Sequence, residues 1–116
     1  MQSLLGISHH AMDAVMALAY QLYQAGRYAE AEALCRGLIA VDHTYWWSYS
    51  LHAATLRRLG KLRAALDALE AGLVYEPNQP KLLFMRSEIG AELEAREAAA
   101  APVTSPPTQP TTAVAP

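Results

Sequence analysis

Cysteine is almost absent from this chain of 116 residues. Cys35 stands alone, so no disulfide forms within the chain, and a lone thiol fits a reducing compartment. Long apolar runs are missing too, since no stretch approaches the roughly 18 apolar residues of a membrane span. The N-terminus lacks the basic start and the apolar core of a signal peptide. We therefore expect a cytoplasmic protein without membrane insertion.

The chain also has no large excess of either positive or negative charge. The formal net charge of −2 provides no long-range attraction to nucleic acid or to an acidic membrane. Four basic residues cluster around one predicted turn, where solvated charge is ordinary: Arg57, Arg58, Lys61 and Arg63. We expect no nucleic-acid partner.

The patterns of catalysis and metal binding are missing as well. There is no Gly-x-Ser-x-Gly elbow, no Gly-rich phosphate loop and no paired-carboxylate arrangement. His9 and His10 are neighbours and therefore diverge on a helix, and His43 and His52 have no nearby cysteine or carboxylate at ligand spacing. Cys35 occupies a predicted apolar stripe, so a buried and inert thiol is expected. We predict that the protein is not an enzyme and needs neither metal nor cofactor.

Proline is rare until the chain approaches its end. Five of the seven prolines fall after Ala101, in a stretch that carries no charge. Such a stretch has too few bulky apolar groups to offset the entropy lost on ordering. We predict a disordered tail at 100–116, a folded domain at 11–99 and a separate N-terminal segment at 1–10.

What the sequence does contain is a repeat at an interval of 34 residues, which separates Gly26 from Gly60. The same interval separates three further pairs: Ala19 and Ala53, Leu22 and Leu56, and Ala31 and Ala65. This period is typical of the tetratricopeptide repeat, a helix–turn–helix hairpin that stacks into a solenoid. Solenoids of this kind present curved surfaces that hold peptides, and they rarely carry out chemistry.

Apolar residues recur at helical spacing on both sides of each repeated glycine. Glycine supplies the left-handed conformation that ends a helix, so turns are expected at Gly26 and Gly60. Five helices are predicted. The first covers 11–24, the second contains 31–39, and the others cover 45–58, 62–75 and 80–98. Pro77 stops the fourth, and Asn78 or Gln79 caps the fifth. The expected fold is all-α, with two tetratricopeptide repeats and a C-terminal capping helix.

The residues around Gly26 carry a more specific resemblance. The stretch 18–31, LAYQLYQAGRYAEA, resembles the first repeat of the class II chaperones of type III secretion. Those are cytosolic tetratricopeptide proteins that hold translocator subunits before export. The stretch 38–43, LIAVDH, looks like the Leu-x-x-Leu-Asp-His ending of that family, where ordinary repeats have Asp-Pro. The resemblance covers about residues 15–75 and implies a bacterial secretion chaperone.

The chain departs from that family at three points. Residues 51–55 read LHAAT where the family has a Gly-Leu-Gly-Ala-Cys-like run, and Leu62 replaces a common aromatic. A single helix follows where the family has a third full repeat. Because of these departures, the class of the sequestered subunit stays open, and a translocator, a needle subunit or an early export substrate is expected. The alternative function is a small adaptor or scaffold that mediates protein–protein assembly.

The resemblance also implies where the secreted subunit or its peptide binds. In stacked repeats the first helix of each hairpin lines the concave face, and the family pattern selects its residues. These are Asp13, Met16, Tyr20, Tyr23, Gln24, Trp47, Ser50, Ala54, Arg57, Arg58, Lys81, Phe84 and Glu88. Aromatic and methionine side chains offer adaptable contact area, and the arginines suit carbonyls or carboxylates.

Four aromatic residues have alternative placements. Tyr23 and Tyr49 fit the core between helices at least as well as the groove. Trp46 and Trp47 point about 100° apart on a helix, so only one faces the groove. The other is expected to pack on the neighbouring repeat or on a second subunit. The apolar segment 4–7 is a candidate dimerisation element by the resemblance, and a homodimer or a complex with another chaperone stays open.

Overall fold

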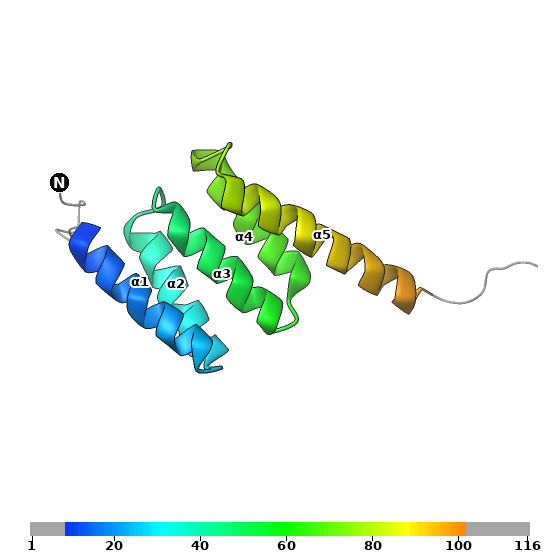
Figure 1. The fold of residues 1–116 in the computed structure, drawn as a ribbon, viewed down its shortest axis with the longest axis horizontal. Coiled ribbons are helices and arrows are strands. Elements are labelled where there is room, and N and C mark those ends of the chain that lie inside the picture. Colours follow the sequence, from blue (N-terminus) through cyan, green and yellow to red (C-terminus); the bar gives the residue numbers. More distant parts are fainter. Residues whose placement is uncertain (1–8, 102–116) are drawn as a thin grey trace, which may run out of the picture.

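The computed structural model describes residues 9–101, which form five helices joined by short turns (Figure 1). The helices are α1 (His9–Gln24), α2 (Tyr28–Val41), α3 (Trp46–Arg58), α4 (Leu62–Tyr75) and α5 (Pro80–Ala100). Each helix packs on the next, with α1, α3 and α5 in one layer and α2 and α4 behind them. The predicted all-α solenoid of two repeats and a capping helix is confirmed over this range. The segment 4–7 and the tail after Ala101 lie outside the described residues.

Both hairpin turns contain a glycine in the left-handed region. Gly26 has a φ of +80°. Its N–H donates to the Tyr23 carbonyl at 3.1 Å, and the Arg27 N–H donates to the Leu22 carbonyl at 2.9 Å. This pair of bonds is the Schellman arrangement that ends a helix. The turn at Gly60, whose φ is +79°, repeats both bonds 34 residues later.

Two clusters of buried side chains hold the layers together. The larger lies between α3, α4 and α5, and the smaller joins α1, α2 and α3 around Ala19, Cys35 and Leu51. The four alanines of the repeat are fully buried: Ala19, Ala31, Ala53 and Ala65. Since alanine is small, the helices of each hairpin can approach closely at these positions.

Gly72 of α4 lies directly against α3. A Cβ at this position would lie 2.8 Å from Cβ and from Cγ of Tyr49, and 3.0 Å from Cδ1 of Leu82. Carbon atoms do not pack that closely, so glycine permits the three helices to meet here. Tyr49 is buried in the larger cluster, and its hydroxyl donates to the His43 carbonyl at 2.7 Å. The core placement of Tyr49 is thereby confirmed.

The connections between hairpins use side-chain hydrogen bonds. The Asp42 carboxylate accepts bonds from N and Oγ1 of Thr44, at 3.0 and 2.6 Å, and so forms the turn after α2. The His43 ring packs against Tyr75 at the end of α4, with ring centroids 4.9 Å apart. Before α5, Oε1 of Gln79 accepts from the N–H of Lys81 at 3.2 Å, so Gln79 is the cap.

His52 has an acidic partner on α2. Its Nε2 lies 2.9 Å from the Glu32 carboxylate, which also accepts from Arg36 at 2.8 Å. Burial by itself raises the pKa of Glu32, but the hydrogen bonds from His52 and Arg36 outweigh it and lower that pKa. The pair therefore links α2 to α3.

Cys35 gives a direct test of this packing. Its side chain is fully buried, and burial raises the pKa of the thiol to about 12. Because pH 8 lies about four units below this pKa, only about one thiol in ten thousand is ionised at that pH. We expect iodoacetamide to leave the native protein unlabelled and to label it fully in denaturant, as measured by mass spectrometry. Rapid labelling of the native protein would contradict this placement.

Candidate peptide-binding groove

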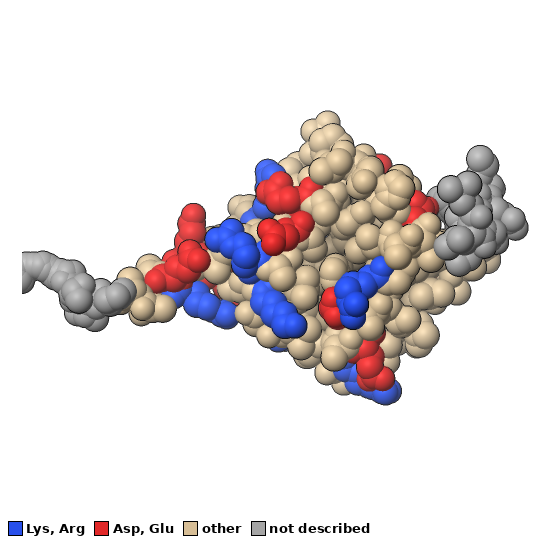
Figure 2. Space-filling model, turned by 180° about the vertical axis from the view of Figure 1, so that it is seen from behind, with Lys and Arg blue, Asp and Glu red and all other residues tan. Residues whose placement is uncertain are grey.

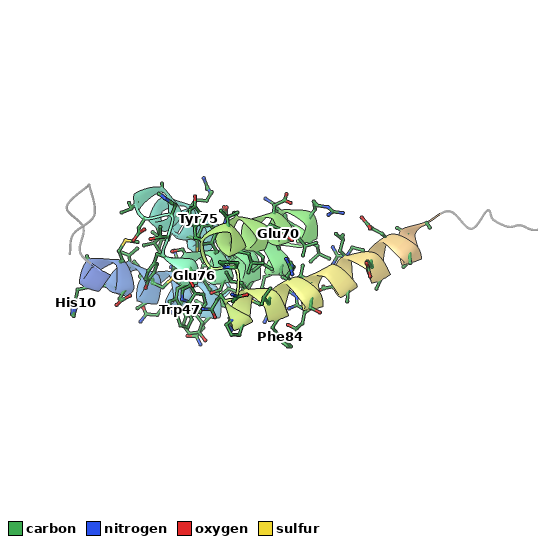
Figure 3. The ribbon with its side chains drawn as sticks, turned by 90° about the horizontal axis from the view of Figure 1, so that it is seen from above. His10, Trp47, Glu70, Tyr75, Glu76 and Phe84 are labelled. Atoms are coloured by element: carbon green, nitrogen blue, oxygen red, sulfur yellow. The ribbon has the colours of Figure 1, made fainter. Side chains whose placement is uncertain are left out.

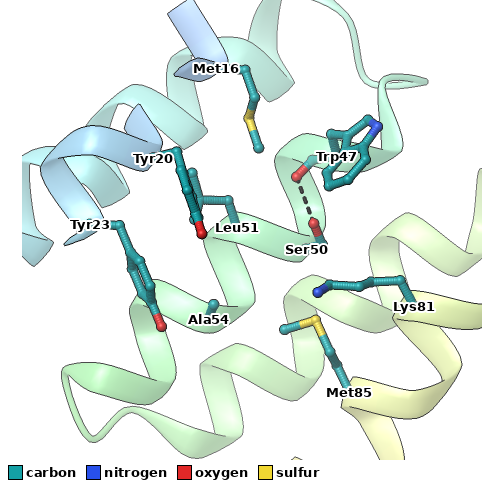
Figure 4. A pocket seen from close by; sticks show the side chains of 9 residues that line it. All are labelled: Met16, Tyr20, Tyr23, Trp47, Ser50, Leu51, Ala54, Lys81 and Met85. Carbon is teal, nitrogen blue, oxygen red and sulfur yellow. Dashed lines mark hydrogen bonds between the residues drawn. The ribbon is translucent and has the colours of Figure 1, made fainter. Parts of the chain in front are cut away.

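A groove follows α3 on the face that α1, α3 and α5 form together (Figure 4). Its central cavity has a volume of about 230 Å³. Its lining residues are Met16, Tyr20, Tyr23, Trp47, Ser50, Leu51, Ala54, Lys81 and Met85. Apart from Leu51 and Met85, all of them belong to the set predicted from the sequence.

The groove continues along α3 in both directions. Toward the start of α3, a second cavity shares Met16, Tyr20, Trp47 and Lys81 and adds Asp13, Ala17 and Tyr45. Toward the end of α3, a third shares Tyr23, Ala54 and Met85 and adds Arg57, Arg58 and Glu92. The three cavities therefore form one continuous surface with an apolar centre.

One wall of the groove is a row of tyrosines on α1 and at the start of α2. Tyr20 and Tyr23 are three residues apart and stack, with ring centroids 6.3 Å apart and planes at 14°. Tyr28 meets Tyr23 edge-on at 5.5 Å. Tyr20 remains 50% exposed, whereas Tyr23 is half-buried and also packs against the smaller core cluster. Tyr23 thus serves both of the roles predicted for it.

The two tryptophans lie on the opposite side of the central cavity from Tyr20. Only Trp47 lines the groove cavities, as predicted for one of the pair, and the two rings stack, with centroids 4.5 Å apart and planes at 21°. The Cα–Cβ bonds of adjacent helical residues do point apart, but the two side-chain torsions bring the indoles back together. Trp46 packs on the larger core cluster and supports Trp47, which lines the groove and is 48% exposed.

Two hydroxyl groups beside the groove are bonded within the protein. Oγ of Ser50 donates to the Trp47 carbonyl at 2.9 Å, so the hydroxyl is satisfied inside α3 (Figure 4). The Tyr45 hydroxyl donates to the Asp13 carboxylate across α3 and α1. Burial raises the pKa of Tyr45 well above its usual range, and Asp13 raises it further. The Tyr45 hydroxyl therefore stays protonated and joins the two helices.

The two adjacent arginines have different partners. Nε of Arg57 donates to Glu92 at 2.8 Å and so ties α3 to α5. Arg58 donates to the Tyr23 hydroxyl at 3.3 Å, and its guanidinium lies 5.9 Å from the Tyr23 ring centroid. The hydrogen bond to Tyr23 raises the pKa of Arg58. Arg57 is thus engaged in an interhelical ion pair, while Arg58 lies exposed over the tyrosine row.

Three residues of the predicted set lie outside these cavities. Phe84 is 63% exposed and projects to the same side as Trp47 in Figure 3, but it does not line them. Gln24 is exposed at the end of α1, and Glu88 lies 3.7 Å from Arg57. Met85 and Leu51 line the centre instead, and they are 34 residues apart. The repeat interval was therefore a signal that could have identified both.

Solved structures with the same arrangement of helices include two bacterial chaperones. The translocator chaperone SycD of Yersinia enterocolitica gives a TM-score of 0.74 at 25% identity, over 83% of this chain and 70% of SycD. PcrH, solved with the chaperone binding region of PopD, gives 0.70 at 26% identity, over 81% of this chain and 71% of PcrH. This chain is structurally similar to type III secretion translocator chaperones. Neither family models nor curated proteins match its sequence.

A further solved structure of SycD has the same fold. SycD has also been solved in complex with a peptide of the translocator YopD, and that structure gives a TM-score of 0.68 at 24% identity, over 79% of this chain and 69% of SycD. Within residues 9–101, no helix is both long and apolar enough to cross a membrane. In the same range, no group of three or more His, Cys, Asp or Glu residues is arranged to hold a metal ion. The functional proposal rests on the groove and on the exposed aromatic side chains that line it.

Proposed function

We propose that this chain is a cytoplasmic chaperone of a type III secretion system. Its groove holds an apolar segment of a secreted subunit until export and so prevents that segment from associating with other copies. The observation that carries the proposal is the row of half-exposed aromatic side chains along one continuous groove. Large apolar side chains that stay exposed in this way mark binding surfaces.

The similarity to SycD and PcrH supports the same proposal. Both were solved with segments of translocator proteins, YopD and PopD. We therefore place a translocator first among the candidate subunits, ahead of a needle subunit or an early export substrate. A second copy of this chain or another chaperone is a further proposed partner. The proposed mechanism is sequestration, and it involves no catalysis, metal or nucleotide.

Co-expression tests the proposal directly. A candidate subunit that is insoluble when expressed alone is expected to become soluble with this chain and to purify with it as a complex. The measurement is the soluble fraction with and without the chaperone, and an unrelated aggregation-prone protein is the control. If the subunit stays insoluble and the chain captures only folded partners, the adaptor function replaces the chaperone function.

A further inference from the structure

The groove carries positive charge that the fold itself does not neutralise. Most Lys and Arg side chains lie beside carboxylates, as Arg36 does beside Glu32. Figure 2 shows blue and red side chains adjoining on the face that is hidden in Figure 1. The paired cations are Arg27, Arg36, Arg57, Arg63, Arg86 and Arg96. Among the described residues, three cations have no carboxylate within 4.0 Å: Arg58, Lys61 and Lys81.

Two of these three cations line the groove, and they lie toward its opposite ends. Lys81 lines the central cavity and the cavity at the start of α3, whereas Arg58 lines the cavity at the end of α3. Of the acidic side chains in the groove, Glu92 is paired with Arg57, whereas Asp13 accepts from the neutral Tyr45 hydroxyl and keeps its negative charge in the cavity that Lys81 also lines. The open groove therefore presents an apolar centre between two available cations.

We propose that the groove selects an extended segment in which carboxylates flank apolar side chains. One carboxylate meets Lys81, the other meets Arg58, and the apolar side chains between them contact Met16, Tyr20 and Met85. This inference rests on the proposed chaperone function and names the chemical class of the captured segment. Complementary charge of this kind adds specificity and speeds association.

The spacing of the two carboxylates follows from helix geometry. Lys81 lines the same cavity as Trp47, and Arg58 follows Trp47 by 11 residues on α3. At 1.5 Å per residue this separation is about 16 Å along the groove. An extended chain covers that length in about five residues at 3.3 Å each. A terminal carboxylate reaches only one of the two cations, so internal Asp or Glu side chains are the expected ligands.

Arg58 is also preorganised for this contact. Its guanidinium lies 5.9 and 6.0 Å from the ring centroids of Tyr23 and Tyr28, and it donates to the Tyr23 hydroxyl. A side chain held by two rings loses less rotamer freedom when it binds a carboxylate. The remaining N–H groups of the guanidinium can then form a bidentate pair with a partner's Asp or Glu.

Three synthetic peptides test the charge selection. Each carries a fluorescent label, a blocked C-terminus and the same apolar centre, with Glu, Gln or Lys at the first and last positions of a five-residue span, whose side chains lie on the same face of an extended chain. By fluorescence anisotropy at low salt, we expect the Glu peptide to bind the full-length protein about tenfold tighter than the Gln peptide, and the Lys peptide to bind most weakly. The advantage of the Glu peptide is expected to shrink in 0.5 M salt.

Charge reversal in the protein provides the matched comparison. The double variant Lys81→Glu with Arg58→Glu is expected to prefer the Lys peptide. Lys61 is an exposed cation outside the three cavities, so the control variant Lys61→Glu is expected to bind the three peptides in the same order as the native protein. Circular dichroism establishes that each variant is folded. If the native protein binds the Glu and Gln peptides equally, the charge selection is wrong and the chaperone function stands. If no peptide binds and no subunit is captured on co-expression, the proposed function itself fails.

Discussion

Replacing Tyr20 and Trp47 together with alanine is expected to weaken capture of the secreted segment at least a hundredfold without unfolding the protein. Both rings lie in the central cavity, and about half of each side chain is exposed. Aromatic side chains at the centre of a binding surface typically contribute about 2 kcal/mol each, and 1.4 kcal/mol corresponds to a tenfold change in affinity. Because neither ring belongs to the two buried clusters, helix content and melting temperature should change little.

The measurement is co-purification of the subunit, or anisotropy of a labelled peptide, beside circular dichroism and a melting curve. Val74→Ala is the matched control, because Val74 is 72% exposed on α4 and lies outside the groove cavities. Phe84→Ala determines whether the binding surface extends along α5. Unchanged binding by the double variant would place the site elsewhere, and a large loss of helix would make the two rings structural.

Gly72→Ala is expected to lower the free energy of unfolding by about 2 kcal/mol, although alanine is the better helix former. The new Cβ would meet Cβ and Cγ of Tyr49 at 2.8 Å. Neither atom lies at the flexible end of the side chain, so α3 and α4 must separate to admit it. For a domain of this size the melting temperature should fall by about 10 °C.

Gly37→Ala is the matched control for this substitution. Gly37 also lies inside a helix, α2, but a Cβ there meets nothing within 4 Å. Alanine should therefore stabilise the protein by about 0.5 to 1 kcal/mol through its helix propensity. Urea unfolding of both variants measures the contrast. A shift of the same sign in both variants would contradict the close approach at Gly72.

Much of the groove was predictable because the pattern of the resembling family assigns groove positions on one face of each first helix. Met16, Tyr20, Tyr23 and Trp47 were placed in this way, and the structure brings their side chains to one cavity. Met85 was missed, because the family pattern of groove positions falls on Phe84 instead. A difference of one residue on a helix turns a side chain by about 100°, which is enough to move it out of the cavity.

The roles of individual side chains depended on partners distant in the sequence. Arg57 and Arg58 look equivalent as neighbours, but Arg57 bonds to Glu92 on α5 while Arg58 lies over the tyrosine row. The sequence around Gly72 does not indicate that this residue lies against Tyr49. Both facts arise from distances between helices that lie far apart along the chain.

By itself the sequence determined the helices, their glycine turns, the two-repeat solenoid and the face that lines the groove. These features follow from local backbone preferences and from apolar spacing within single helices, which a linear pattern records. Only the tertiary structure decided that Gly72 must lack a side chain, that the two indoles stack, and which groove cations lack a carboxylate partner. Those outcomes depend on interhelical distances and side-chain torsions, which emerge when the helices pack together.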